Sequence, residues 1–343
     1  MTRVYYILRN SLYLLIPMAA MAATSCAHAA DFYAGKQVKI IIGSNVGGGY
    51  DRYGRLLAHH IGKFIPGKPS TVVLNMPGAG GLKSVQYAYG VAAKDGTEII
   101  NIRASNALDS VLGIRGGKMD FTKFIWIGSM ASDTDICLFS KASGIRSFQD
   151  ILTQDSTIGG TGKGAQAFSF PNAINNVLGT KMKIILGYKG TGDRVLSIER
   201  GELKGSCGIN GSTFLSVLSR QYKEGTLIPV LQSGLKANPL LKDVPLTISY
   251  AKTDEQRSIL EGVFSQMEIA RPYAGPPGVP ANRISLLRKA FDATMVDDAF
   301  LKEAKKVKVD ISPIDGAGVE AVIEKMTRMP AELRKKVRAA IEG

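Results

Sequence analysis

Short apolar runs alternate with amphipathic stretches along residues 37–232. The apolar runs are rich in Ile and Val, which is typical of buried strands. The predicted strands cover residues 37–43, 70–76, 97–102, 135–140, 156–160, 182–188 and 227–232. Helical patterns lie between them at residues 50–64, 81–93, 147–153, 167–179, 193–201 and 213–222. This alternation predicts α/β domains, each with a mainly parallel sheet flanked by helices.

The pattern also suggests where one domain gives way to the other. A first α/β unit ends near Gly128, and a second begins there and closes near Gln232. The chain then becomes rich in loops, and it ends with helices that are broken at Pro330. We expect domain 1 to comprise residues 30–128 and 238–343, and domain 2 to comprise residues 129–237.

The N-terminal segment is typical of a secretory signal peptide. A basic start, an apolar run at residues 11–23 and the small-x-small pattern Ala-His-Ala at residues 27–29 predict cleavage after Ala29. The apolar run is shorter than the roughly 20 residues that a membrane-spanning helix needs. A lipoprotein anchored through Cys26 is the alternative. Either reading predicts an exported protein, and we expect it in the periplasm.

The chain is basic, with a formal net charge of +14. Its lysines and arginines are scattered, without a continuous basic run and without interleaved aromatic residues. This distribution argues against nucleic acid as a partner and favours positive potential focused at a cleft for small anions.

Two cysteines remain after the predicted cleavage, Cys137 and Cys207. Two are too few for a disulfide framework. Two separately buried thiols are the simpler expectation, and a single bridge in an oxidising compartment is the alternative.

Glycine-rich segments follow several of the predicted strands. Gly47, Gly48 and Gly49 follow the first strand, but no lysine stands where a Walker A loop requires one. Lys163 in a second glycine loop is followed by Gly164, which removes the hydroxyl that would bind magnesium. A dinucleotide-binding G-x-G-x-x-G loop also requires an acidic residue about 20 positions later, at the end of the second strand. Here the second strand ends at Asn75 and Met76 instead. What remains is backbone N–H groups at helix N-termini, which suit any small anion.

Catalytic and metal-binding patterns are weak. The mature chain has only two histidines, His59 and His60, and no G-x-S-x-G sequence occurs. Asp133 and Asp135 have no metal-ligand spacing around them. We therefore expect no enzyme activity and no cofactor, with a secreted α/β hydrolase of anionic esters or phosphates as the alternative.

The motifs together resemble a known family, the solute receptors of tripartite tricarboxylate transporters, also called Bug-type periplasmic binding proteins. The sequence VKIIIGSNVGGGYDRYGRLLAHHIGKFIPG is similar to the opening of these receptors, and DFTKFIWIGSM, GYKGTGDRVLSIERGELKG and RPYAGPPGVPANRISLLRKAF are similar to later segments in the same order. The shared loop positions are Gly48, Gly49, Asp51 and Arg55, then Asn75 and Pro77 to Gly81, then Lys94 to Gly96.

The resemblance implies a two-domain, Venus-flytrap fold that closes over a small organic anion, usually a carboxylate, and passes it to membrane permease subunits. It implies a first lip formed by Ser44, Asn45, Gly48, Gly49 and Tyr50. It implies a second lip formed by Thr161, Gly162, Lys163 and Ala165, with Ser105, Tyr188 and Asn210 elsewhere around the cleft.

The sequence departs from the family pattern at three places. Many members have an aromatic residue where Ser44 stands, a hydroxyl residue where Ala165 stands and a histidine near Phe168. Tyr50, Lys163 and Phe168 could supply an aromatic wall and a cation instead, which suggests an aromatic carboxylate as the ligand. We expect a monomer, and a ligand-sensing receptor without transport is a further alternative.

Overall fold

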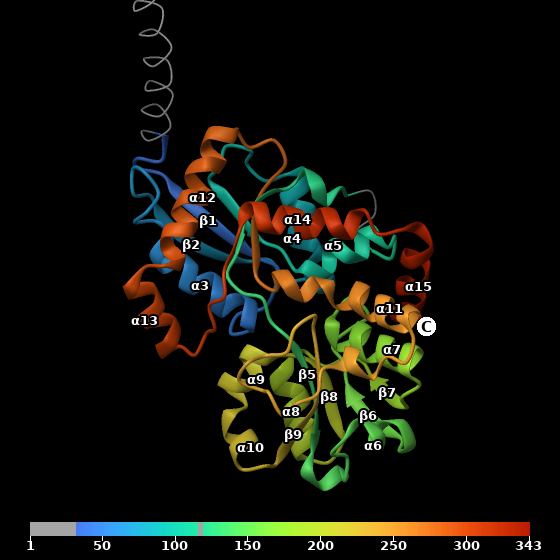
Figure 1. Ribbon diagram of the computed structural model, residues 1–343. Coiled ribbons are helices and arrows are strands. Elements are labelled where there is room, and N and C mark those ends of the chain that lie inside the picture. Colours follow the sequence, from blue (N-terminus) through green and yellow to red (C-terminus); the bar gives the residue numbers. More distant parts are fainter. Residues whose placement is uncertain (1–31, 116–118) are drawn as a thin grey trace, which may run out of the picture.

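The computed structural model describes residues 32–115 and 119–343, and it folds into two lobes (Figure 1). The first lobe is built on a six-stranded sheet with the order β11-β4-β10-β3-β1-β2. β1, β2 and β3 are parallel, whereas β10 and β11 are antiparallel to their neighbours. The strands are β1 (Gln37–Ile42), β2 (Ser70–Asn75), β3 (Glu98–Asn101), β4 (Ile125–Ser129), β10 (Pro272–Gly275) and β11 (Ile314–Asp315).

Helices cover both faces of this sheet because successive strand residues point to opposite sides. Ile40 and Ile42 belong to an apolar core with Leu57 and Phe291, whereas Ile41 belongs to the core on the other face. The helices of this lobe are α3 (Gly49–Ile61), η1 (Ala79–Gly81), α4 (Leu82–Gly90), α5 (Ala104–Val111), η2 (Phe121–Lys123), α12 (Ala281–Met295), α13 (Asp298–Lys306) and α14 (Gly316–Thr327).

The second lobe is built on a five-stranded sheet with the order β7-β6-β8-β5-β9. β6 is parallel to β7 and β8, and β5 is antiparallel to β8 and β9. β9 carries Pro229, which is tolerated because β9 lies at the edge of the sheet. The strands are β5 (Asp135–Ser140), β6 (Ser156–Gly159), β7 (Met182–Ile185), β8 (Gly205–Asn210) and β9 (Leu227–Ser233). The helices are η3 (Lys141–Ser143), α6 (Phe148–Thr153), α7 (Gln166–Leu178), α8 (Thr191–Glu199), α9 (Gly211–Val217) and α10 (Ser219–Lys223).

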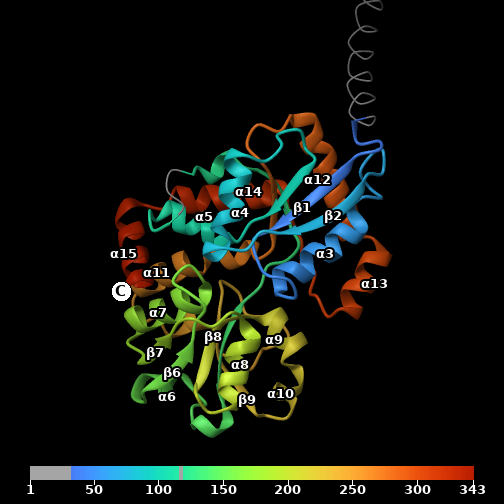
Figure 2. The same cartoon turned by 180° about the vertical axis from the view of Figure 1, so that it is seen from behind.

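The last segments of the chain join the two lobes. After η4 (Thr247–Tyr250), helix α11 (Asp254–Phe264) packs against α7, and so does the C-terminal helix α15 (Ala331–Glu342). Figure 2 shows α11 and α15 at the level where the lobes meet. One apolar core therefore runs without a break from the first lobe, through these helices, into the second lobe.

Two chain segments cross between the lobes side by side. The segment between β4 and β5 and the segment from η5 (Ser265–Ile269) to β10 are joined by backbone hydrogen bonds. Asp133 N donates to Met267 O over 3.0 Å, and Ala270 N donates to Ala131 O over 3.0 Å. These hydrogen bonds hold the two connecting segments together.

All seven predicted strands are present, as β1, β2, β3, β5, β6, β7 and β9, and the predicted α/β class is confirmed. The expectation of mainly parallel sheets is wrong, because β10 and β11 in the first sheet and β5 in the second pair antiparallel with their neighbours, so that both sheets are mixed. The sequence analysis missed β4, β8, β10, β11 and α5. The predicted signal peptide and Cys26 lie outside the described residues. Among the residues that the structure describes, no helix is both long and apolar enough to cross a membrane.

The expectation of two separate thiols is wrong. A disulfide joins Cys137 in β5 to Cys207 in β8. The sequence could not indicate this pairing because β8 was not predicted, so its position beside β5 was unknown.

Candidate functional site

A cleft of about 710 Å³ lies between the lobes. Its walls are the loops that follow β1, β2 and β3 in the first lobe and β6, β7 and β8 in the second. Ligands of α/β proteins usually bind at these carboxyl ends of strands. The cleft therefore lies where the fold favours a binding site.

The first wall is the glycine loop between β1 and α3. Gly47 has a φ of 84°, a conformation that residues other than glycine rarely adopt. Asp51 in the first turn of α3 fixes this loop, since its carboxylate accepts hydrogen bonds from Gly47 N at 2.9 Å, Arg55 Nε at 2.9 Å and Asn75 Nδ2 at 2.8 Å. Burial alone would raise the pKa of Asp51, but these hydrogen bonds hold it below its usual value. The shared motif residues Asp51 and Arg55 thus shape the loop.

The lobes touch at the rim of the cleft. A Cβ atom on Gly80, in the loop after β2, would lie 3.1 Å from the carbonyl oxygen of Gly164 in the second lobe. A Cβ on Gly49 would lie 3.4 Å from Thr213 Oγ1 in α9. Glycine at these positions lets the two walls approach each other closely.

Helix N-termini surround the cleft without side-chain caps. Helices α3, α5, α7, α8 and α9 begin at the cleft, and their N-cap residues line it. None of these residues caps its helix through a side chain. The N-caps are, in the same order, Gly48, Arg103, Ala165, Gly190 and Asn210. By contrast, α6, α11, α13 and α14 begin outside the cleft with the capping residues Ser147, Thr253, Asp297 and Asp315. The first backbone N–H groups of α3, α7 and α8 can therefore bind an anion, whereas at α9 Gly211 N and Ser212 N already donate to Thr134 O and to Asp133 Oδ1.

Arg103 brings a positive charge into the cleft. Its Cζ lies 4.7 Å from the centre of the Tyr50 ring. Its Nε is buried and has no hydrogen-bond partner within residues 32–115 and 119–343. Burial lowers the pKa of Arg103, Tyr50 opposes this shift, and the positive charge of Arg271 adds to it. A half-buried cation of this kind favours a negatively charged partner.

Arg271 also lies against the Tyr50 ring, and it is already paired. Its Cζ lies 4.6 Å from the centre of the Tyr50 ring. Its Nη2 donates to Asn210 Oδ1 over 2.8 Å and lies 3.9 Å from Asp133 Oδ2. Asn210 Nδ2 in turn donates to Asp135 Oδ1 over 2.9 Å. This buried polar cluster fixes the Asn210 carboxamide at the base of the cleft.

Arg194 in α8 also lines the cleft, but its hydrogen bonds are made within the second lobe. Its Nη1 donates to Ser206 Oγ and to the Cys207 carbonyl, each over 2.7 Å. Its Nη2 donates to Thr191 Oγ1 over 3.2 Å. Arg194 therefore acts mainly as a buried support for the loop between β7 and α8.

Solved structures with the same architecture are periplasmic binding proteins. The periplasmic binding protein BugD is 19% identical, with a TM-score of 0.68 over 90% of this chain and 98% of that chain. MatC from Rhodopseudomonas palustris, solved with bound malate, is 14% identical, with a TM-score of 0.67 over 88% of this chain and 99% of that chain. An R. palustris protein solved with adipate is 15% identical, with a TM-score of 0.69 over 88% of this chain and 97% of that chain. The chain has the fold of a periplasmic solute-binding protein.

The two-domain fold that the resemblance implied is thus confirmed. No family profile and no curated protein matches the sequence significantly, and the identities to the solved structures are low. The similarity to these solved structures is therefore in the fold, which tolerates wide sequence change. The ligand has to be inferred from the residues that line the cleft.

Within this solute-binding fold, the structure brings most of the predicted site residues together. The residues that line the cleft are Ser44, Asn45, Gly48, Gly49, Tyr50, Thr161, Gly162, Ala165, Tyr188 and Asn210. Ser105 and Lys163 are not among the lining residues. Ser105 is buried within α5, and the Lys163 side chain is exposed. Phe168 lies inside α7 and is also absent from the lining.

The sequence analysis named Lys163 as the cation, whereas the structure places Arg103 in the cleft. Arg103 directly follows the predicted strand at residues 97–102, so its position at a strand end was an available signal. What could not be read was its lack of a partner, because that depends on every residue packed around it. Thr191 and Thr213 were missed for the same reason, since each lies at the start of a helix whose orientation was unknown.

Proposed function

We propose that this protein is an exported receptor that captures a small carboxylate between its lobes and delivers it to a permease of the tripartite tricarboxylate type. The observation that carries the proposal is the Arg103 guanidinium, which lines the cleft and whose buried Nε has no partner in the described chain. A ligand carboxylate would supply the missing acceptor and the missing negative charge. Hydrogen bonds to charged groups contribute about 1.5 to 3 kcal/mol each.

Arg103 alone is not sufficient for useful affinity. Micromolar binding needs about 8 kcal/mol, and one exposed helix N-terminus contributes only about 0.3 to 1 kcal/mol. Several uncapped helix N-termini, from both lobes, face the same cleft. Their combined N–H groups, together with Arg103, would supply the binding free energy of about 8 kcal/mol when the cleft excludes water.

Two of the structural neighbours hold malate and adipate, which supports a dicarboxylate as the ligand class. We propose that a dicarboxylate bridges the lobes, with one carboxylate at Arg103 and the other at the helix N-termini of the second lobe. An aromatic carboxylate remains a candidate because Tyr50 lines the cleft. Its ring already contacts the guanidinium groups of both Arg103 and Arg271, so we favour the aliphatic class.

Closure of the lobes would complete the site. The Gly80–Gly164 approach and the Gly49–Thr213 approach both join one lobe to the other at the cleft. A ligand that contacts both walls favours the closed arrangement by its differential affinity for it. The segments around residues 130–134 and 265–271 would act as the hinge between domain 1 (residues 30–128 and 238–343) and domain 2 (residues 129–237).

A thermal-shift screen of the mature protein against mono-, di- and aromatic carboxylates tests the proposal. A ligand at a hundredfold excess over its Kd should stabilise the fold by about 2.7 kcal/mol. We expect aliphatic dicarboxylates to raise the Tm most. If no carboxylate raises it while an ester or phosphate substrate is turned over, the protein is an enzyme and the proposal is wrong.

A further inference from the structure

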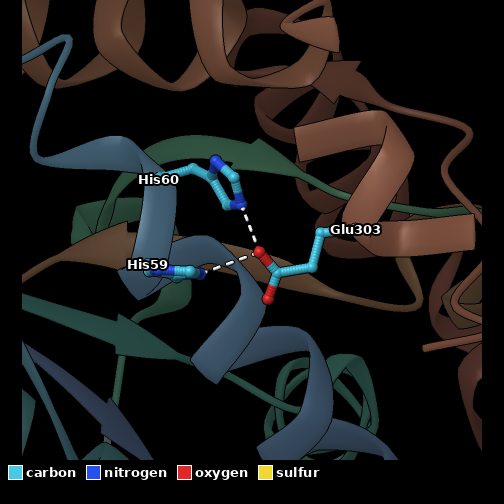
Figure 3. A group of neighbouring side chains, drawn as sticks. All are labelled: His59, His60 and Glu303. Carbon is cyan, nitrogen blue, oxygen red and sulfur yellow. Dashed lines mark hydrogen bonds and ion pairs between the residues drawn. The ribbon is translucent and has the colours of Figure 1, made fainter. Parts of the chain in front are cut away.

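Three side chains far from the cleft converge on one point. His59 Nδ1 and His60 Nε2 each lie 2.8 Å from the same carboxylate oxygen, Oε2 of Glu303 (Figure 3). One potential ligand atom from each residue lies within 4.8 Å of the others. This spacing is compact enough for one metal ion to contact all three, since zinc bonds to imidazole nitrogen and carboxylate oxygen are about 2.0 to 2.2 Å long.

Two helices bring these side chains together. His59 and His60 occupy the last turn of α3, while Glu303 lies in α13. His60 is only 7% exposed, and its ring packs edge-on against Phe300 with 5.6 Å between ring centres. The His59 side chain is 70% exposed. The cluster therefore combines one rigid ligand with one that solvent and ions can reach.

A further carboxylate lies behind His60. Asp297 Oδ1 is 3.8 Å from His60 Nδ1, the ring nitrogen that does not face Glu303. Asp297 is held in place because it caps α13 through Phe300 N at 2.9 Å and pairs with Lys63 Nζ at 2.6 Å. Metal-binding histidines commonly direct their second ring nitrogen to a carboxylate, which fixes the ring and its tautomer.

Glu303 supplies an anionic oxygen ligand, because a glutamate carboxylate is ordinarily ionised at neutral pH. Two imidazoles and one carboxylate form a donor set that suits zinc and related first-row metals, whereas magnesium and calcium prefer oxygen ligands.

We propose that His59 Nδ1, His60 Nε2 and a carboxylate oxygen of Glu303 bind one Zn²⁺ ion, with water completing a four-coordinate site. The ion would replace the hydrogen bonds that now join the imidazoles to Glu303. It would also cross-link α3 to α13, which are separated by more than two hundred residues in sequence. The site is independent of the proposed anion binding, because the cleft is formed by the opposite, N-terminal end of α3.

The composition of the chain makes this site easy to test. The sequence contains three histidines, and the third, His28, belongs to the predicted signal peptide. Cys137 and Cys207 are joined in a disulfide and provide no thiolate. A tag-free mature protein therefore has imidazole signals from His59 and His60 alone.

We expect calorimetry with zinc chloride to show one ion per chain of EDTA-treated, tag-free protein. Both imidazole signals should move in ¹H–¹⁵N spectra of histidine-labelled protein, and magnesium and calcium chloride should cause no such change. His59→Ala and Glu303→Gln should each weaken zinc binding by about tenfold or more. His59 is exposed, so its removal should leave the fold intact.

Glu332→Gln is the matched control, because it removes an exposed helical carboxylate that pairs with Lys335 and lies elsewhere on the surface. It should bind zinc as the unsubstituted protein does. The proposal is overturned if zinc leaves both imidazole signals in place, or if His59→Ala and Glu303→Gln bind zinc as tightly as Glu332→Gln does.

Discussion

Arg52, Arg103 and Arg194 line the cleft, Arg271 is buried beside Tyr50, and their surroundings give each a different role. Arg52 donates to Ser216 Oγ and to the Val307 carbonyl. Arg194 donates to backbone and hydroxyl oxygens of its own lobe. Arg271 is balanced by Asp133 and donates to Asn210. Arg103 stacks on Tyr50 and keeps a buried donor without a partner in the described residues. Charge alone would rank these arginines equally, whereas their partners single out Arg103 for the ligand.

Asp135 is a second residue whose surroundings lead to a prediction, namely that the stability of the fold depends on pH. Burial, followed by the neighbouring Asp133 carboxylate, raises the pKa of Asp135 to about 7, although Arg271 and Arg194 oppose the shift. In the unfolded chain the group ionises near pH 4. Between these two values the folded protein binds the extra proton, so stability contributed by neutral Asp135 is lost as the pH rises towards 7.

Asp135→Asn removes the cost of burying an ionised carboxylate at high pH, and the asparagine keeps an oxygen that accepts from Asn210 Nδ2. We expect the variant to melt about 2 °C or more above the unsubstituted protein at pH 8. The difference should shrink towards pH 4, where Asp135 is protonated in the fold. Melting curves of both proteins across this range provide the check, and a difference that grows on acidification would contradict the assignment.

Among the elements, the strands and glycine loops were predictable, because runs of Ile and Val end at glycines and then give way to helical patterns. The missed elements lack such signals. β8 has the sequence GSCGIN, and α5 has the sequence ASNALDSV with Ser105, Asn106 and Asp109 all buried. α5 packs against η5 and α14, which lie more than 150 residues later in the sequence. Such tertiary packing cannot be read from local sequence.

The disulfide between β5 and β8 gives a prediction at the element scale. It closes a loop with a sequence separation of 70 residues. In the chain-entropy account, a loop of this length stabilises the fold by about 4 kcal/mol. Cys137→Ala combined with Cys207→Ala should lower the Tm by several degrees, and dithiothreitol should lower the Tm of the unsubstituted protein but not that of the variant. Two free thiols detected in the oxidised, denatured protein would contradict the bridge.

At the scale of the whole molecule, one side of the lobe boundary is packed and the other is open. The core that continues through α11 and α15 joins the lobes on one side, while the uncapped helix N-termini and Arg103 face the cleft. The sequence indicated two α/β units and their glycine loops. It could not indicate that α11 and α15 pack on α7, because that packing brings together segments about 90 to 165 residues apart.

The central claim is that Arg103 binds the carboxylate of a ligand held between the lobes. The most direct test is the Kd of the tightest ligand from the carboxylate screen, measured by calorimetry for Arg103→Met and for Arg257→Met. Methionine keeps much of the side-chain length, and Arg257 is an exposed arginine of α11, so both variants lose the same charge. A loss of about 2 kcal/mol predicts binding weakened about 30-fold in Arg103→Met and unchanged in Arg257→Met. Equal affinities in the two variants would contradict the account.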